Sequence, residues 1–270
     1  MDVTVITVTW NSAKYIADQM RSVIFGCEGL TWEQIVVDNA SSDETVQVVE
    51  SICPLFTKEG VGGGYKIIKN PRNFGFAGGY NQAVKKAEGR YFLYLNPDMK
   101  ILEPIAPLVK YLDDHPNVGI ASAKLVEDNG EINLEATPRR FPRWSEALII
   151  FFKLPHIFPK ILDRYLYRDT NFSKIVEPTE VDSVRGSFML IRREIVEKLG
   201  FAFDPRYFLW WEDVDLCREV KRLGYKIVWH PGVRCVDRVG QSFRVRNVVW
   251  KQWNFFKGAV KYFVKWGILN

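Results

Sequence analysis

The tripeptide Asn96-Pro97-Asp98 could do chemistry because of what precedes it. Residues 91–95 form a short apolar, aromatic run, which is the pattern of a buried strand. Such a strand delivers the Asp98 carboxylate to the rim of a sheet, where ligands bind in open α/β sheets. A carboxylate there suits a hard divalent cation, and the cation suits a diphosphate. The same tripeptide also makes an ordinary turn, so both interpretations stay open at this point.

A second carboxylate, Asp38, follows the apolar residues 34–37. An aspartate at a strand end can accept a hydrogen bond from a ribose hydroxyl or from the imide N–H of a base. The alternative is that residues 38–43 only cap the next helix. Because Ser42 or Asp43 can fill that role, we expect Asp38 to remain available for a ligand.

Residues 70–81, NPRNFGFAGGYN, form a glycine-rich loop that leads into a predicted helix. Glycines let backbone N–H groups approach a phosphate closely. The loop is not a Walker loop, because no Gly-Lys-Ser/Thr follows, and its spacing excludes the dinucleotide fingerprint. The alternative is a tight turn that starts a helix.

Three carboxylates, Glu212, Asp213 and Asp215, stand at a predicted helix start directly after Trp210 and Trp211. Part of this cluster complements the helix dipole. Two adjacent tryptophans are not explained in that way. Aromatic side chains beside a carboxylate make a partly desolvated site, where an aspartate can act as a base towards a hydroxyl, and aromatic faces stack on sugar rings.

His230 and Asp237 lie on or beside two predicted short strands, residues 226–228 and 233–236. A lone histidine is usually structural. Two side chains that can bind metals, close to the end of the same domain, indicate a ligand role as the alternative.

These residues need a scaffold of alternating strands and helices. The expected strands are residues 3–8, 34–37, 65–68, 91–95, 118–122 and 181–192, and the expected helices are residues 12–25, 43–52, 78–88, 105–112 and 213–223. This alternation predicts βαβ units and a mostly parallel sheet flanked by helices, which is an α/β fold.

The later part of the chain is dense in apolar and aromatic residues. Residues 145–167 are predicted either as helices that cover the sheet edge or as an insertion facing a membrane or an acceptor. Residues 245–269 combine Trp, Phe and Lys. They are predicted either as a packed terminal helix or as a basic aromatic helix that lies on a membrane.

Composition restricts the class of protein. The chain has 270 residues, 47% of them hydrophobic, and a net charge of +5, which suits anionic ligands or an anionic membrane surface. No long Lys/Arg block indicates a nucleic-acid partner. The four widely spaced cysteines predict reduced thiols. Without a secretory signal pattern or a run of about 20 apolar residues, we expect a cytoplasmic protein that contacts the inner face of the membrane only peripherally, if at all.

Together these segments resemble the family-2 inverting glycosyltransferases, which have the GT-A fold, and especially the bacterial rhamnosyltransferase-like branch that builds surface polysaccharides. The matching motifs run in chain order over residues 3–242: VITVTWNS (5–12), VVDNASSD (36–43), NFGFAGGYN (73–81), LYLNPD (93–98), GSFMLIR (186–192) and EDVDLCR (212–218).

The resemblance implies a role for each matching residue. Asp38 would hold the nucleotide base, with Thr9 and Asn11 nearby, and Asp213 would be the catalytic base. The implied donor-binding residues are Thr9, Asn11, Asp38, Asn73, Gly79, Asn81 and Asn96. The implied acceptor-binding residues are Gly186, Trp210, Trp211 and Glu212.

The resemblance also implies a divalent cofactor, Mg²⁺ or Mn²⁺, with Asp98 as a ligand. Two positions depart from the family pattern. Asn96 stands at the first position of the family's Asp-x-Asp motif. Asp237 stands where the family usually has a further histidine ligand, while His230 comes just before Pro231. Either Asp237 or His230 completes the metal site, and we favour Asp237.

The expected organisation is a GT-A domain at residues 1–242, with a donor half at about 1–125 and an acceptor half at about 126–242, followed by a basic aromatic helix at 243–270. The implied activity moves a sugar, first of all L-rhamnose from dTDP-rhamnose, to a saccharide or lipid-linked saccharide.

Two alternatives belong to other classes. A non-catalytic module that binds nucleotide sugars or glycans would bind without turnover, and intact Asp213 and Asp98 argue against it. A nucleotidyltransferase would need a glycine-rich, basic loop after the first strand, and residues 9–12 lack one.

Overall fold

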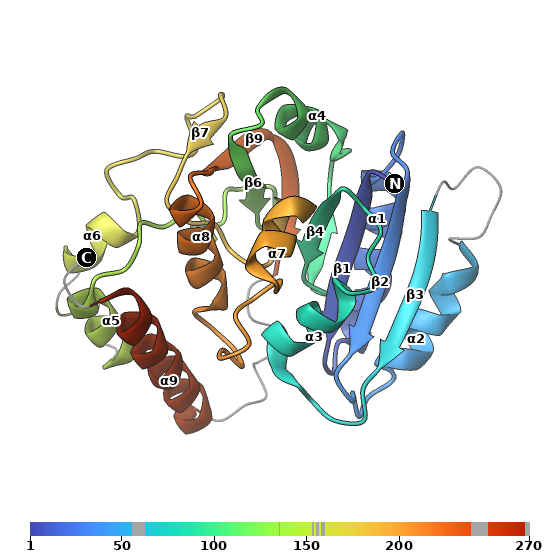
Figure 1. The fold of residues 1–270 in the computed structure, drawn as a ribbon, viewed down its shortest axis with the longest axis horizontal. Coiled ribbons are helices and arrows are strands. Elements are labelled where there is room, and N and C mark those ends of the chain that lie inside the picture. The colour runs from blue at the N-terminus through green and yellow to red at the C-terminus, as the bar shows by residue number, and fades with distance from the viewer. Residues whose placement is uncertain are drawn as a thin grey trace.

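The computed structural model describes residues 1–55, 63–134, 136–152, 154, 157, 160–238 and 248–267. Within these ranges the strands form one nine-stranded sheet in the order β3-β2-β1-β4-β8-β6-β9-β5, with β7 paired to β9 (Figure 1). The strands are β1 (Val3–Thr9), β2 (Trp32–Asp38), β3 (Gly63–Lys69), β4 (Tyr91–Leu95), β5 (Met99–Ile101), β6 (Val118–Val126), β7 (Thr179–Glu180), β8 (Phe188–Arg192) and β9 (Lys226–Asp237). The helices are α1 (Ala13–Gly26), α2 (Thr45–Ile52), α3 (Gly75–Ala83), α4 (Ala106–Asp114), α5 (Trp144–Phe151), α6 (Ile161–Tyr165), α7 (Arg193–Leu199), α8 (Glu212–Arg222) and α9 (Val248–Trp266), with a 3₁₀ turn at Cys53–Leu55.

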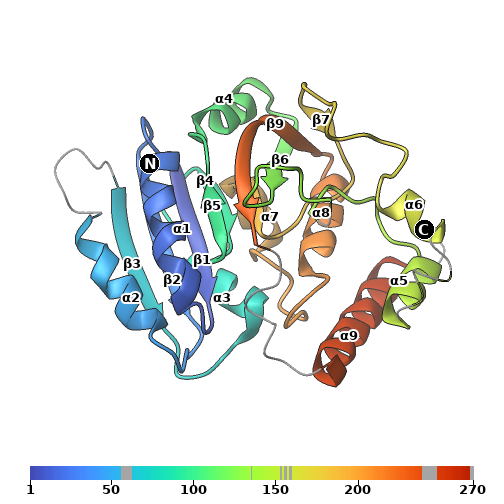
Figure 2. The same ribbon diagram turned by 180° about the vertical axis from the view of Figure 1, so that it is seen from behind.

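The first half of the sheet is parallel and covered on both faces. β3, β2, β1 and β4 pair in parallel register. Figures 1 and 2 show α1 and α2 on one face and α3 on the other. Alternate residues of β1 serve the two cores: Val3 and Val5 pack in one, and Ile6 and Val8 in the other. Burial on both sides explains why these strands read as nearly continuous apolar runs.

The second half of the sheet is mixed. β8 is antiparallel to both β4 and β6, and β5 is antiparallel to β9, whereas β6 and β9 are parallel. The expected alternation of strands and helices therefore holds through β4, and the parallel pairing with it. Beyond β6 the chain makes a long excursion before β8 enters the sheet, so the βαβ rule no longer sets the direction of the strands.

Most expected elements are present, and the differences have local causes. β9 is one strand with an irregular stretch between Ala123/His230 and Lys124/Arg234, rather than two separate strands. α3 begins at Gly75, three residues before the expected start at Gly78. Of the strand expected at residues 181–192, only the part after Phe188 is regular. β5 and α7 were not expected.

The late helices pack on one another rather than on the sheet edge. α5 lies against α9, and a third core joins Ala147 to Tyr207, Trp211, Tyr262 and Phe263. The expected helix at residues 245–269 is therefore a packed helix on one side, while Val249, Trp253 and Val264 on another side are exposed. Among the described helices, none combines the length and the apolar character needed to cross a bilayer.

Lys265 anchors α9 to the rest of the protein. Its ammonium nitrogen lies 3.1 Å from a carboxylate oxygen of Asp204, 2.7 Å from one of Asp215 and 2.8 Å from one of Glu219. The neighbouring Trp266 donates its indole N–H to Asp215 over 2.7 Å. Burial raises the pKa values of Asp204 and Glu219, but the hydrogen bonds from Lys265 and the nearby arginines outweigh it and leave both pKa values lowered. Asp204 and Glu219 are therefore charged at neutral pH, whereas burial leaves the pKa of Asp215 raised despite its hydrogen bonds from Lys265 and Trp266.

We expect Lys265→Met to destabilise the protein at pH 7 by about 3 kcal/mol, because it leaves buried carboxylates without their shared cation. Groups with lowered folded-state pKa values contribute stability above their unfolded pKa of about 4 and lose it as the pH falls. The difference from the wild type should therefore shrink below about pH 4. Urea unfolding across pH measures both effects. Lys110→Met, which breaks an exposed pair with Asp114, is the control and should leave the stability nearly unchanged. Equal losses from the two variants would contradict the anchoring role.

Candidate functional site

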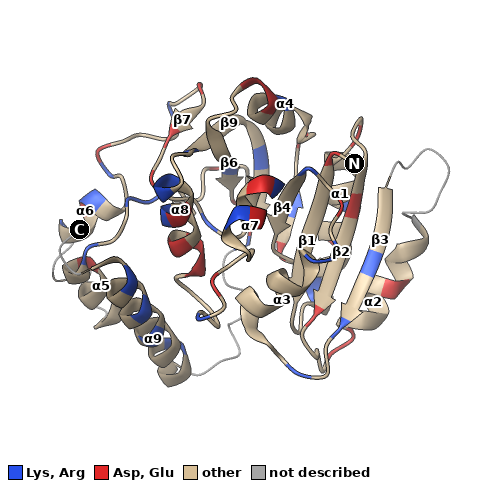
Figure 3. Ribbon diagram, in the orientation of Figure 1, with Lys and Arg blue, Asp and Glu red and all other residues tan. Residues whose placement is uncertain are grey.

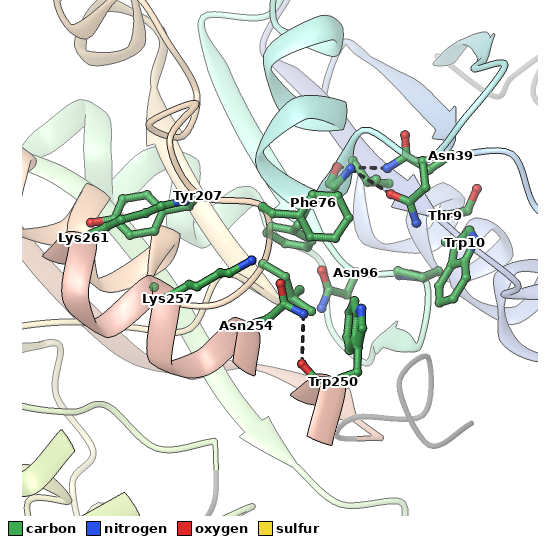
Figure 4. Close-up of a pocket in the computed structure, with 17 residues that line it drawn as sticks. Thr9, Trp10, Asn39, Phe76, Asn96, Tyr207, Trp250, Asn254, Lys257 and Lys261 are labelled. Carbon is green, nitrogen blue, oxygen red and sulfur yellow. Dashed lines mark hydrogen bonds between the residues drawn. The ribbon is translucent and has the colours of Figure 1, made fainter. Parts of the chain in front are cut away.

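A cavity of about 520 Å³ opens where the carboxyl ends of β1 and β4 meet α9, and we call it the first cavity (Figure 4). Its lining comes from strand ends, from the start of α3, from the segment before α8 and from one face of α9. The lining residues are Val8, Thr9, Trp10, Asn39, Asn73, Gly75, Phe76, Asn96, Pro97, Tyr207, Phe208, Leu209, Trp250, Asn254, Lys257, Gly258 and Lys261.

Asp38 lies beside the first cavity but does not line it. Its carboxylate accepts hydrogen bonds from the Thr9 hydroxyl (2.9 Å), the Ser41 N–H (2.9 Å) and the Ser41 hydroxyl (2.5 Å). Asn11 holds the same loop, because its amide oxygen accepts from the N–H of Ser42 over 2.8 Å. These hydrogen bonds use part of the accepting capacity of Asp38, and its role in binding the base stays a prediction, while Thr9 and Asn39 line the cavity at this end.

The first N–H groups of the glycine-rich loop donate hydrogen bonds within the protein. Gly75 takes a left-handed φ of +82° and donates its N–H to the side chain of Asn73 over 2.8 Å. Phe76 donates its N–H to the carbonyl of Phe208 over 2.8 Å. At these two positions the backbone N–H groups are used within the protein, as the tight-turn alternative predicts, while Asn73 lines the cavity.

Gly79 and Asn81 position α3 instead of lining either cavity. A Cβ at Gly79 would lie 2.7 Å from a methyl carbon of Val8, so only glycine lets the helix approach β1 this closely. Asn81 accepts hydrogen bonds from the N–H groups of Ala202 (2.7 Å) and Phe203 (3.1 Å). Both residues act on the site through packing.

A second cavity, of about 470 Å³, adjoins the first and shares Phe76, Asn96 and Leu209 with it. The sequence-predicted acceptor residues all line it together with Asp213. The lining residues are Phe76, Asn96, Thr137, Arg139, Ile150, Tyr165, Ser183, Val184, Arg185, Gly186, Ser187, Leu209, Trp210, Trp211, Glu212, Asp213, Val214, Lys251 and Phe255.

Asp213 is fixed in the second cavity by two backbone donors. Gly186 donates its N–H to one carboxylate oxygen over 3.2 Å, and Val214 donates to the other over 2.8 Å. A Cβ at Gly186 would lie 3.2 Å from Cβ of Asp213, which is a tight contact, so the glycine makes room for this approach. The position in the first turn of α8 also favours a negative charge.

Glu212, which precedes Asp213 in the chain, has a different environment. Its side chain is buried, with the residue 5% exposed, and its Oε2 has no hydrogen-bond partner among the described residues. Burial, and then the negative charge of Asp213, raise the pKa of Glu212 well above its ordinary value. Burial therefore favours the neutral form of Glu212, and the adjacent carboxylate of Asp213 disfavours a second negative charge there.

Trp210 and Trp211 both have left-handed backbones, with φ of +64° and +72°. Such conformations in non-glycine residues cost on the order of 1–3 kcal/mol each and persist only where the surroundings impose them. Here α9 imposes them. The Trp211 ring packs 5.2 Å from that of Phe255 and 5.3 Å from that of Tyr262, and a Cβ at Gly258 would lie 2.5 Å from Trp211. Trp211 is thus mainly a support for the start of α8, although its edge reaches the second cavity.

The expected metal ligands separate into two groups. Asp98 directly precedes Met99, which pairs with Asp237 across β5 and β9, so the two buried carboxylates lie at the same end of neighbouring strands. His230 pairs with Ala123 on β6, about four residues along the sheet from the level of Asp237, which is on the order of 13 Å. The ring of His230 packs against that of Tyr111. The structure therefore brings Asp237, and not His230, to Asp98.

Neither Asp98 nor Asp237 lines a cavity, but Asn96 connects them to both cavities. The Asn96 N–H donates to the carbonyl of Ser187, whose hydroxyl donates to Asp237 over 3.1 Å. Burial raises the pKa of Asp237, although the Arg185 charge and this hydroxyl oppose the increase. The amide oxygen of Asn96 is buried without a partner among the described residues. Within those residues, no group of three or more His, Cys, Asp or Glu is arranged to hold a metal ion.

Sequence reasoning missed the residues that α9 contributes to the first cavity: Trp250, Asn254, Lys257 and Lys261. Their spacing at i, i+4, i+7 and i+11 is a signal of a shared helix face. That face was not assigned to a ligand, because the sequence does not show which element packs over the strand ends. Arg185 was also missed: it lines the second cavity, and its charge interacts with those of Asp237 and Asp213.

Comparisons with known proteins agree with this architecture. Residues 4–200 match the sequence profile described as Glycosyl transferase family 2. Rhamnosyltransferase WbbL of Escherichia coli is 26% identical over 200 residues, which are 71% of this chain and 68% of WbbL. The poly(ribitol-phosphate) beta-N-acetylglucosaminyltransferase TarS of Staphylococcus aureus is 31% identical over 125 residues, which are 43% of this chain and 19% of TarS.

Solved structures share the fold at low sequence identity. The mannosyltransferase PcManGT from Pyrobaculum calidifontis, in complex with GDP-Man and Mn²⁺, superposes with a TM-score of 0.64 at 22% identity, over 97% of this chain and 63% of that one. GalNAc-T7 with UDP, GalNAc and Mn²⁺ gives a TM-score of 0.68 at 17% identity, over 98% of this chain and 48% of that one. These likenesses show the GT-A fold, and this chain spans only part of each relative's length.

The raised pKa of Glu212 predicts a specific pH dependence. A group whose folded-state pKa is raised contributes stability below its unfolded pKa of about 4.3 and loses it as the pH rises through the folded value. Glu212→Gln removes this loss, so we expect the variant to melt at a higher temperature than the wild type at pH 7 and above and to lose this advantage near pH 4. Melting curves across pH measure the effect. Glu197→Gln, at an exposed pair with Arg193, is the control. Parallel profiles for Glu212→Gln and the wild type would show that Glu212 is ionised in the folded protein.

Proposed function

The chain belongs to glycosyl transferase family 2, and from this membership we propose that it transfers a sugar from a nucleotide-diphosphate donor to a hydroxyl group of a saccharide acceptor, with inversion at the anomeric carbon. The observation that best supports the proposal is the adjacency of the two cavities. Asn96, Phe76 and Leu209 line both, and Asp213 lines the second. A donor in the first cavity would have its sugar at this shared wall.

In the proposed reaction Asp213 is the catalytic residue. Its carboxylate accepts the proton of the acceptor hydroxyl, whose oxygen forms the new bond to the anomeric carbon from the face opposite the nucleotide. The bond from that carbon to the diphosphate breaks, and its electron pair leaves with the phosphate oxygen. The N–H of Gly186 keeps Asp213 oriented, and neutral Glu212 adds no competing charge.

A divalent cation fits the donor set near Asn96. The carboxylates of Asp98 and Asp237 and the unpartnered amide oxygen of Asn96 would hold Mg²⁺ or Mn²⁺, since both ions prefer oxygen ligands. When bound, the cation neutralises negative charge on the leaving diphosphate. The Mn²⁺ named with the PcManGT and GalNAc-T7 structures supports this assignment by analogy of fold.

We propose L-rhamnose from dTDP-rhamnose as the first donor to test, because WbbL is named a rhamnosyltransferase. The acceptor would be a saccharide or lipid-linked saccharide in surface polysaccharide synthesis. The names of WbbL, of TarS and of a putative teichuronic acid biosynthesis glycosyltransferase, TuaG of Bacillus subtilis, support that context.

The test is a donor screen. Hydrolysis and transfer are measured for dTDP-rhamnose, UDP-GlcNAc, GDP-mannose and other nucleotide sugars, each with Mg²⁺, with Mn²⁺ and with chelator. We expect turnover of at least one donor, with inverted configuration at the anomeric carbon of the product. Tight binding of a nucleotide sugar without any turnover would support a non-catalytic module instead.

Removal of the proposed base should separate chemistry from binding. We expect Asp213→Asn to lower kcat about 1,000-fold while leaving donor affinity within about threefold, because the amide cannot take up the proton. Steady-state kinetics and calorimetric titration of the donor measure the two effects. Asp114→Asn makes the same substitution at an exposed ion pair and should leave kcat unchanged. Unaltered turnover in Asp213→Asn would remove the base assignment.

The proposed location is the cytoplasmic side of the membrane, with peripheral contact through an exposed stripe of α9. Val249, Trp253, Val260 and Val264 share one side of the helix and are exposed. α9 contains lysines and no acidic residue, as the blue segments in Figure 3 show. An apolar stripe beside lysines suits an anionic bilayer surface.

We expect the triple variant Val249→Ser, Trp253→Ser and Val264→Ser to bind anionic vesicles at least about fivefold more weakly than the wild type. Sedimentation with phosphatidylglycerol and with phosphatidylcholine vesicles measures this. Substitutions are preferable to truncation, because α9 also lines the first cavity. Val176→Ser changes an equally exposed valine elsewhere and should have no effect. Unchanged sedimentation of the triple variant would overturn the membrane contact.

A further inference from the structure

We propose that Lys257, with Lys261 one turn further along α9, binds the diphosphate of the donor and neutralises it as it leaves. This inference rests on the proposed function, because it assigns residues to the diphosphate of the same donor. It concerns two side chains outside all the motifs that identify the family.

The first observation is the charge of the first cavity. Lys257 and Lys261 line it, and no carboxylate among the described residues does. Asp38 is turned into its own loop, and Asp98 lies outside the lining. The wall therefore carries positive charge without an acidic counterpart. A nucleoside diphosphate brings about two negative charges, which such a wall complements.

The second observation is the state of the two lysines. Within the part of the chain that the structure describes, Lys257 makes no ion pair, and its ammonium lies 5.0 Å from the centre of the Trp253 ring. Lys261 donates to the carbonyl of Arg206, which does not neutralise its charge. Lys265, one turn beyond Lys261, is instead held by three carboxylates. Of these three lysines on the same helix, the protein neutralises Lys265 but not Lys257 or Lys261.

The third observation is where Lys257 points. Figure 4 shows its side chain extending from α9 towards Phe76 and Asn96, past Asn254. Phe76 and Asn96 form the wall shared with the second cavity, where Asp213 lies. A leaving phosphate oxygen at this wall would meet the ammonium group of Lys257 on one side and the amide of Asn96 on the other.

A lysine suits this task. Its ammonium group is a compact charge with three donors on a flexible stem, so it can follow a phosphate oxygen as negative charge builds up there. In the proposed reaction Lys257 and Lys261 stabilise the departing diphosphate, and they do so beside whatever charge a divalent cation at Asp98 and Asp237 contributes.

The test compares nucleoside diphosphates with monophosphates. Calorimetric titration of dTDP, UDP and GDP, and of dTMP, UMP and GMP, is carried out on the full chain with Mg²⁺ and with chelator. We expect Lys257→Met to weaken binding of the preferred diphosphate about ten- to a hundredfold, because a hydrogen bond to a charged group is lost, and to leave the matching monophosphate within about threefold. Lys257→Met combined with Lys261→Met should weaken the diphosphate further. Lys257→Arg should recover most of the affinity.

Lys251→Met is the matched control for binding, because Lys251 is on the same helix and carries the same charge but lines the second cavity. It should leave the affinity for the diphosphate within about twofold, a difference too small for a direct contact. Melting temperatures of all variants exclude loss of the fold.

The possible results distinguish failure of the Lys257 assignment from failure of the proposed function. Unchanged diphosphate affinity in Lys257→Met, or equal weakening of diphosphate and monophosphate, overturns the assignment of Lys257 while the proposed function stands. A wild-type chain that binds none of the nucleotides overturns the proposed function together with this inference. Selective loss of diphosphate affinity, rescued by arginine and present in chelator, establishes the assignment.

Discussion

The packing of α9 against the Trp210–Trp211 turn determines the geometry of the whole candidate site. Gly258 allows the helix axis to come so close that an added methyl group would overlap Trp211, and Lys265 secures the far end of the helix in an acidic cluster. The two left-handed tryptophans depend on this support, since nothing in their own sequence favours such a backbone. Glu212 and Asp213 follow them directly, so the orientation of the proposed base is inherited from a helix more than thirty residues away in the chain.

Glu212 and Asp213, the adjacent carboxylates at the start of α8, differ in burial and in hydrogen bonding. Asp213 accepts hydrogen bonds from two backbone N–H groups, whereas the buried Glu212 has no partner for Oε2 among the described residues. Both residues line the second cavity, and burial raises the pKa of Glu212. A base must be ionised to accept a proton at neutral pH, so burial disfavours Glu212 for this role.

The fold of the N-terminal half could be predicted from sequence because its strands are buried on both faces and its helices are amphipathic. The strand directions after β6 could not, since they depend on long-range pairing that local pattern does not encode. At the site, the four residues predicted to bind the acceptor all line the second cavity, and their role in acceptor binding stays a prediction. Asp38, Asn81 and Gly79 instead serve loops and packing, because residue type alone does not reveal whether a carboxylate or amide will find partners within the protein. The lysine-rich C-terminal segment was predicted either as a packed helix or as a helix lying on a membrane. Neither alternative assigned its lysines to a ligand, because the sequence does not show which residues a helix outside the sheet covers.

α9 follows every other described element in the chain, and its residues 250–261 form one wall of the first cavity. The parallel half of the sheet uses strand pairings within the first hundred residues. A chain that ended before α9 would keep those strands and most of the family motifs, yet the first cavity would lack a wall and the tryptophan turn would lack its support. Possession of the motifs is therefore not sufficient for a binding site of this shape.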